Sequence, residues 1–279
     1  MRKTTFENYR ILGIIVTYYP QKELLLDNIH RILENIDKLL LWENTPNDVK
    51  EYRFVEHYKI EYCGDGCNSI SHALNYAWKY ALDNGYDFLL TMDQDSQWCD
   101  FRHYVKRTIC NKKAPYGIWG PIINVENGKP EFELRPYVIT SGMLVSLDII
   151  NKLGGWNERF AIDGVDIEFC CRAHEMNIGV YRVTDCNLVQ QYGNPQKVSF
   201  MGHIVYLRND SPKRLYNIFW SYVVLIRRYR NVEGLKNEFY INWIKRIKWI
   251  IAFENNKYRK LQAIIKSIID GFWYDLNSI

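Results

Sequence analysis

The stretch that decides the fold is GYDFLLTMDQDS, residues 85–96. Residues 88–92 form an unbroken run of apolar and β-branched side chains, which predicts a strand buried on both faces. The run ends at Asp93, and Asp95 follows one residue later. Two carboxylates at the end of a buried strand are costly unless a cation compensates their charge. Mg²⁺ and Mn²⁺ prefer such oxygen ligands, so Asp93 and Asp95 are predicted to bind one of them. The alternative is a strand-end turn with two solvated aspartates.

The segments before this strand alternate between strand and helix patterns. Three more strands are predicted, at residues 10–19, 38–42 and 58–63. Apolar residues at helical spacing predict two helices between them, at 22–36 and 70–84. This order predicts an α/β fold with a mainly parallel sheet flanked by helices. Ligands of such sheets bind at the carboxyl ends of the strands. Four segments that follow strands are therefore expected at one rim: 17–20, 43–47, 64–68 and 93–95.

The rest of the chain predicts a second α/β block and then only helices. Residues 137–191 read as strand, helix, loop, helix and strand, and the first of these strands (136–147) carries small polar residues midway. Beyond Asn209 three helices are predicted, at 211–230, 233–254 and 258–273. We therefore expect an α/β domain over 1–208 and a helical extension over 209–279.

Charge and aromatic content single out that extension. Residues 206–279 hold fourteen Lys or Arg against six Asp or Glu, a net charge of +8, and 15% of the whole chain is aromatic. In the middle helix Phe239, Trp243, Ile247 and Ile250 share one face, and Lys245, Arg246 and Lys248 lie off it. This profile is typical of a helix on an anionic membrane surface, although a helix packed on its own domain gives the same pattern.

The same sequence sets limits on location. No apolar run approaches the ~18 residues of a spanning helix, and the N-terminus is not a convincing signal peptide. The expected location is the cytoplasm, with attachment to the inner face of the plasma membrane as the further expectation, and no nucleic-acid partner is expected. The seven cysteines and six histidines show no zinc-ligand spacing and are interpreted as structural.

A second acidic group lies at residues 163–168. Asp166 is in the first turn of a predicted helix, where the helix dipole favours the anion and opposes a raised pKa. As a carboxylate, Asp166 can accept a proton from an attacking hydroxyl, with Asp163 close by. The alternative is a capping carboxylate, from Asp163 or Asp166, beside a solvated Glu168. Upstream, the Gly154-Gly155-Trp156 turn either closes over a ligand or joins two elements.

Taken in order, seven segments resemble inverting glycosyltransferase family 2, and especially its bacterial rhamnosyltransferase-like branch. They span roughly residues 11–216 and read IIVTYYP (14–20), WENTPND (42–48), ISHALNYA (70–77), GYDFLLTMDQDS (85–96), ITSGMLVS (139–146), LGGWNERFAIDGVDIEFCCR (153–172) and SPKRLY (211–216). Each segment alone is weak, but the ordered set is specific. The resemblance implies a GT-A fold, which is a Rossmann-like α/β fold, with a single active site.

The resemblance also implies roles for individual residues. Asp93 lies near the ribose and the metal, and Asp95 binds the metal that bridges the donor's diphosphate. Asp166 matches the catalytic base of a single displacement that inverts the anomeric carbon. Four residues border the nucleotide: Thr17, Tyr18, Pro20 and Glu43. Five face the donor and acceptor sugars: Gln94, Ser141, Gly142, Gly155 and Trp156.

Three departures from the family pattern bear on the substrate. Gln190 stands where the family often has His, Glu43 where it usually has Asp, and Trp220-Ser221 where the branch usually has Arg-Asn. The first expectation is a dTDP-rhamnose donor with a glycan or lipid-linked acceptor, for a bacterial surface polysaccharide. A UDP-hexose donor is the alternative. Two readings from other classes are a haloacid-dehalogenase-type phosphatase, against which Ser96-Gln97 after the acidic pair argue, and a non-catalytic protein that binds carbohydrate or membrane.

Overall fold

The computed structural model describes residues 9–46, 55–125, 128–190, 196–200 and 203–276. The chain divides into two units, Met1–Gln191 and Tyr192–Ile279. This division lies before the boundary expected at 208 and 209. Strands β10 (Gln196–Phe200) and β11 (His203–Leu207) pair with each other as an antiparallel hairpin and are grouped with the helices that follow.

One half of the sheet in the first unit is parallel. Its strand order is β3 (Ile60–Cys63), β2 (Lys38–Glu43), β1 (Ile11–Thr17) and β4 (Phe88–Asp93). The helices α1 (Lys22–Leu33) and α2 (Ile70–Asp83) connect these strands. The ends of these elements agree closely with the ranges expected from the sequence, because each combines a continuous apolar run or a helical stripe with clear breaks.

The other half of the sheet is mixed, whereas the sequence predicted a mainly parallel sheet. β8 (Met143–Ser146) is antiparallel to both β4 and β6 (Gly117–Ile123), and β9 (Gly179–Gln190) is parallel to β6. Two short strands, β5 (Ser96–Trp98) and β7 (Phe132–Leu134), are antiparallel to β9. The segment 136–147 is a strand only in its last part, because a turn at 140–142 precedes β8.

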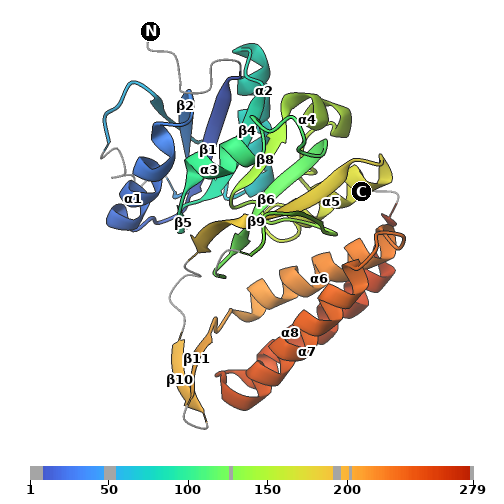
Figure 1. Ribbon diagram of the computed structural model, residues 1–279. Helices are drawn as coiled ribbons and strands as arrows, with labels where there is room; N and C mark the ends of the chain where they lie inside the picture. The colour runs from blue at the N-terminus through green and yellow to red at the C-terminus, as the bar shows by residue number, and fades with distance from the viewer. Residues whose placement is uncertain (1–8, 47–54, 126–127, 191–195, 201–202, 277–279) are drawn as a thin grey trace. The chain divides into compact units, whose positions relative to one another are not determined.

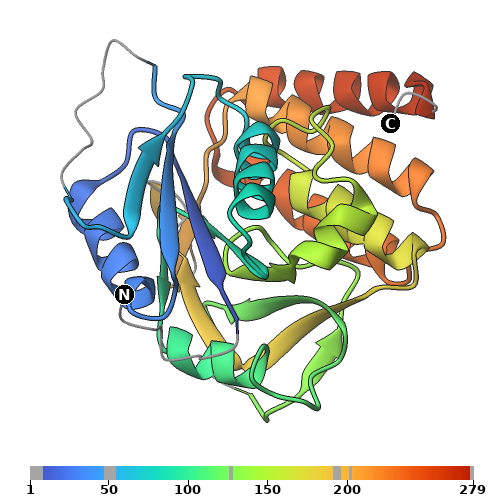
Figure 2. The same ribbon diagram turned by 90° about the horizontal axis from the view of Figure 1, so that it is seen from above.

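Helices cover both faces of this sheet (Figure 2). α1 packs with α3 (Phe101–Arg107) on one face, where Ile15 and Leu90 join a large apolar cluster with Ile29 and Tyr104. On the other face α2 contacts β1 and β4 and packs with α4 (Leu147–Leu153), which contacts α5 (Val165–Glu175). The predicted α/β fold, a sheet flanked by helices, is confirmed.

The second unit combines the β10–β11 hairpin with three helices, α6 (Pro212–Arg228), α7 (Leu235–Phe253) and α8 (Lys257–Trp273) (Figure 1). Leu215, Phe219, Ile250 and Ile264 form its core. Of the stripe predicted to lie on a membrane, Phe239 and Ile250 are fully buried. Trp243 and Ile247 pack against the same core, so this stripe belongs to the interior of the unit. Among the described residues, no helix is both long and apolar enough to cross a bilayer.

Candidate active site

The residues expected at one rim lie at neighbouring strand ends. The parallel register pairs Thr17 with Glu43 and Val16 with Asp93, and it pairs Trp42 with Cys63 on the next strand. The carboxyl ends of β1, β2, β3 and β4 therefore form one edge, as a doubly wound sheet requires. Asn47, the last residue of the expected second segment, lies outside the described residues.

The loop after β1 is held by the residue between the two aspartates. The Gln94 side chain accepts a hydrogen bond from Tyr18 N (2.7 Å) and donates one to Tyr18 O (3.0 Å). Gln94 was expected to face a sugar, but in the structure its amide fixes this loop. The hydroxyl of Thr17 is likewise used internally, since it donates to Trp42 O at 3.1 Å.

The backbone of this loop is strained next to Glu43. Tyr19 has a φ of 46°, which is uncommon for an aromatic residue, and its N–H donates to Thr45 Oγ1 at 2.8 Å. Glu43 Oε1 accepts from Thr45 N at 2.9 Å, so the carboxylate supports the turn that holds Tyr19. Pro20 is buried behind it, and the rings of Tyr18 and Tyr19 are exposed at the rim. Local strain of this kind is maintained by surrounding contacts and often marks a functional site.

Asp93 is fixed from three sides. Its Oδ2 accepts a hydrogen bond from Gln190 Nε2 (2.7 Å), its N–H donates to Ser141 Oγ (3.3 Å), and its carbonyl accepts from Asn28 Nδ2 (3.0 Å). Gln190 is only 8% exposed, and its Oε1 is buried without a hydrogen-bond donor among the described residues. A buried amide oxygen without a donor is unfavourable. Gln190 was noted as a departure from the family pattern but was not predicted as a site residue.

Ser141 and Gly142 form the wall behind Asp93. Ser141 is fully buried, and its hydroxyl bonds to the hydroxyl of Ser96. Gly142 has a φ of 82°, and a Cβ there would lie 2.7 Å from Cγ of Pro121. Only glycine meets both conditions without strain. Both residues were expected to face sugars, and the structure gives them a supporting position at the start of β8.

The carboxyl group of Asp166 has a raised pKa. Burial raises the pKa of Asp166 to about 6, and the negative charge of Asp163 acts in the same direction. The backbone amides of Ile167, 2.9 Å away, and of Thr140 oppose this rise. The sequence led us to expect the helix terminus to keep the pKa low, but loss of hydration outweighs it. A carboxylate with a pKa near 6 is ionised at neutral pH and still basic enough to accept a proton.

The neighbouring Glu168 has a structural role. It is buried and pairs with Arg172 at 2.8 Å, so the solvated Glu168 of the alternative reading is wrong. The guanidinium of Arg172 also donates to Gly155 O at 2.7 Å. The pair thereby ties α5 to the turn after α4.

That turn is closed inward. Trp156 is 3% exposed and stacks on Phe169 with ring centroids 4.5 Å apart. A Cβ on Gly155, whose φ is 79°, would lie 2.4 Å from the Trp78 ring. Gly155 and Trp156 were expected to face the sugars. In the structure both are buried in the turn that follows α4, and their contact with the sugars stays a prediction.

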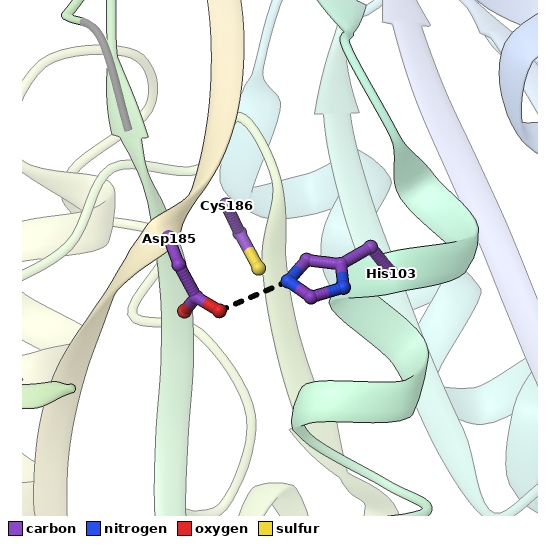
Figure 3. A group of neighbouring side chains, drawn as sticks. All are labelled: His103, Asp185 and Cys186. Atoms are coloured by element: carbon purple, nitrogen blue, oxygen red, sulfur yellow. Dashed lines mark hydrogen bonds and ion pairs between the residues drawn. The ribbon is translucent and has the colours of Figure 1, made fainter. Parts of the chain in front are cut away.

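A cluster that sequence spacing did not reveal lies between α3 and β9. His103, Asp185 and Cys186 bring their ligand atoms within 4.8 Å of one another (Figure 3). Asp185 pairs with both His103 Nε2 and Arg107 Nε at 2.9 Å, so a guanidinium already balances its charge. Burial raises the pKa of the Cys186 thiol and disfavours the thiolate that a metal would need. These contacts make the cluster a brace between helix and sheet.

Comparisons with known proteins agree with this architecture. The chain is 25% identical over 291 residues to the dTDP-rhamnosyl transferase RfbF of Shigella flexneri, covering 95% of this chain and 96% of that protein. No protein-family model matches the sequence.

Three solved structures share the fold. A GalNAc-T7 structure with UDP, GalNAc and Mn²⁺ superposes with a TM-score of 0.61 at 11% identity, over 97% of this chain and 56% of that one. The mannosyltransferase PcManGT of Pyrobaculum calidifontis with GDP-Man and Mn²⁺ superposes with a TM-score of 0.61 at 12% identity, over 95% of this chain and 88% of that one. The structure of S. aureus TarS superposes with a TM-score of 0.55 at 11% identity, over 93% of this chain and 49% of that one. This chain thus spans about half the length of the first and third of these structures.

Proposed function

We propose that this chain, which has the GT-A fold and resembles the bacterial rhamnosyltransferases, is a glycosyltransferase that transfers rhamnose from dTDP-rhamnose to a glycan or lipid-linked acceptor. The observation that carries the proposal is Asp93 at the end of β4, fixed by Gln190 and Ser141. The full-length match to a relative named as a dTDP-rhamnosyl transferase supports the donor. A UDP-hexose is the second candidate, since a structure with the same fold holds UDP.

Asp95, together with Asp93, is proposed to hold Mn²⁺ or Mg²⁺. Both side chains are partly exposed at the rim, and a divalent cation of this kind binds few carboxylates and takes its other ligands from phosphates and water. The buried Oε1 of Gln190 adds an oxygen acceptor beside Asp93. Two structures with the same fold hold Mn²⁺. When bound, the cation would supply positive charge to the leaving diphosphate.

The nucleotide is proposed to lie on the loop after β1. Thr17, Pro20 and Glu43 shape this loop from within, as their buried or hydrogen-bonded positions indicate. The exposed ring of Tyr18 is the surface that a base would meet.

Asp166 is proposed as the general base, with Asp163 beside it. Asp166 takes the proton from an acceptor hydroxyl while that oxygen forms a bond to the anomeric carbon. The bond from that carbon to the diphosphate oxygen breaks, and the nucleoside diphosphate leaves with the electron pair. Attack from the face opposite to the leaving group inverts the configuration. Burial that raises the pKa of Asp166 to about 6 supports this role.

The proposed acceptor and the charge of the C-terminal helices together bear on the cellular location of the protein. We propose synthesis of a bacterial surface polysaccharide in the cytoplasm, with the C-terminal unit attached to the inner face of the plasma membrane. The net charge of +8 in residues 206–279 supports attraction to anionic lipid.

Calorimetric titration with dTDP and with UDP, each with and without Mn²⁺, tests the proposal. Metal-dependent binding of dTDP is expected, and preference for UDP would favour the second candidate. Asp95→Ala should abolish both metal-dependent binding and turnover, whereas Asp166→Asn should abolish turnover and keep binding. Failure of the folded protein to bind either nucleotide would overturn the proposal.

A further inference from the structure

Helix α8 carries an exposed apolar stripe. Five large side chains along it are between 52% and 79% exposed: Tyr258, Ile265, Ile269, Phe272 and Trp273. Their spacings of three, four and seven residues place them on one side of the helix. The opposite side, with Ile264 and Ser267, is buried in the second unit. Soluble proteins seldom leave so many large apolar side chains exposed along one line.

Helix α7 carries a second stripe of the same kind. Tyr240, Ile241, Ile244 and Ile251 are each 53% or 54% exposed. They alternate with the buried set of Phe239 and Ile250 that the sequence had suggested for a membrane. The apolar face predicted from helical periodicity is therefore real, but it is the buried face of α7. The exposed apolar face is the one formed by Tyr240, Ile241, Ile244 and Ile251.

Basic side chains flank both stripes. On α8 these are Lys257, Arg259 and Lys266, and on α7 they are Lys236, Lys245 and Lys248, all exposed. The acidic residues within the two helices are only Glu238 and Asp270, both half-buried, and Asp270 accepts a hydrogen bond from Tyr216. Each helix thus presents an apolar centre with a cationic border and no exposed carboxylate.

We propose that each of these two stripes can dock on an anionic lipid bilayer, with the stripe on α8 as the main contact. The apolar side chains would enter the boundary between head groups and acyl chains, while the lysines and arginines reach the lipid phosphates. Tyr and Trp along α8 have the amphipathic rings that favour this depth. A second copy of the chain is the poorer match, because it would bring two cationic borders together. The inference concerns only the second unit and does not depend on the donor sugar.

Sedimentation of the full-length protein with vesicles tests this surface. Binding is expected to vesicles that contain phosphatidylglycerol, to weaken in high salt, and to be much weaker to phosphatidylcholine alone. The double variant Ile265→Glu/Phe272→Glu should weaken binding at least about tenfold, because two apolar side chains become charged. Lys245→Gln and Lys248→Gln should each weaken it about fivefold.

Leu82→Glu on α2 is the matched control, because it also places a carboxylate at an exposed apolar site, 43% exposed, but in the first unit. It should leave vesicle binding unchanged, and all variants should keep their helical circular dichroism and their nucleotide binding. Nucleotide binding without vesicle binding would overturn this inference while leaving the proposed transfer reaction intact. Equal vesicle binding by the α8 variant would also overturn it. So would a dimer in lipid-free sedimentation that the same variant dissociates.

Discussion

At the scale of single residues, the burial that makes Asp166 a better base also lowers the stability of the folded protein. Asp166 has an ordinary pKa of 3.8 and a folded-state pKa of about 6. The folded protein therefore holds this proton more tightly than the unfolded chain does. The ionised carboxylate lowers stability fully above about pH 6, and this cost disappears below about pH 4. The expected cost at neutral pH is roughly 2–3 kcal/mol.

Asp166→Asn should separate the two effects. The amide cannot accept the acceptor's proton, so turnover should fall at least about 100-fold. The same change removes the buried charge, so the free energy of unfolding at pH 8 should rise by about 1–3 kcal/mol, and this gain should vanish near pH 4. Urea denaturation at the two pH values provides the measurement. A variant that is less stable at pH 8 would contradict the raised pKa.

Gln190 provides a second prediction at this scale. Gln190→Met removes the donor to Asp93 Oδ2 and the buried acceptor Oε1 while keeping side-chain volume. Loss of a partner that orients a metal-ligating carboxylate typically weakens metal affinity 10- to 100-fold, and calorimetry of Mn²⁺-dependent dTDP binding should show a loss of about this size. Gln97→Met is the matched control, since Gln97 also lies in the sheet but donates to Asp27, at 2.6 Å. Equal losses in both variants would argue for a general effect on the sheet.

At the scale of elements, the two glycines in the turn after α4 allow two costs of an added side chain to be measured separately. One is the cost of a positive φ, and the other is the cost of a steric clash. Gly154 and Gly155 have φ values of 75° and 79°, but a Cβ on Gly154 meets nothing within 4 Å, whereas one on Gly155 meets Trp78 at 2.4 Å. Gly154→Ala should cost about 1–2 kcal/mol, the backbone term alone. Gly155→Ala should cost a further 1–3 kcal/mol or so, because the ring must move. Thermal unfolding of the two variants measures the difference in stability. Equal costs would mean that the Trp78 ring moves aside without loss of stability.

The strands show why part of the fold could be predicted and part could not. β1, β2 and β4 are apolar runs with clear breaks, and their parallel register brought Thr17, Glu43 and Asp93 to one edge as expected. β6 was missed because its glycines and Pro121 normally argue against a strand. A Cβ on Gly117 would lie 2.2 Å from Gly179 O, so that close approach requires glycine.

The candidate site divides in the same way. The acidic residues are visible as residue types at strand and helix ends, so Asp93, Asp95 and Asp166 could be named from sequence. The Gln190 contact joins residues 97 positions apart in the chain and has no local signal. Trp156 looked like an exposed aromatic tip because sequence does not reveal the Phe169 ring on which it stacks.

At the scale of the whole molecule, the chain divides into two units with different charge. The net charge of residues 206–279 is +8, while the preceding residues carry −4. Inside the second unit, Glu254 is 1% exposed and pairs with Arg246 and, at 2.7 Å, with Lys260, which is itself buried. A buried pair of this kind adds little net stability, but removing one partner leaves an uncompensated charge inside.

Glu254→Gln should therefore destabilise the second unit selectively. The change removes the carboxylate partner of the buried Lys260 and leaves Arg246 paired with Asp210 at 3.1 Å, at a cost of about 3–5 kcal/mol. Asp148→Asn, which breaks an exposed pair with Lys152 on α4, is the control and should not move the unfolding curve. Helical circular dichroism should report an early transition in the Glu254 variant, and calorimetry below the main transition should still detect nucleotide binding. If nucleotide binding disappears together with the early loss of helix, the two units unfold as one cooperative body. In that case the C-terminal helices are needed to keep the nucleotide-binding unit folded.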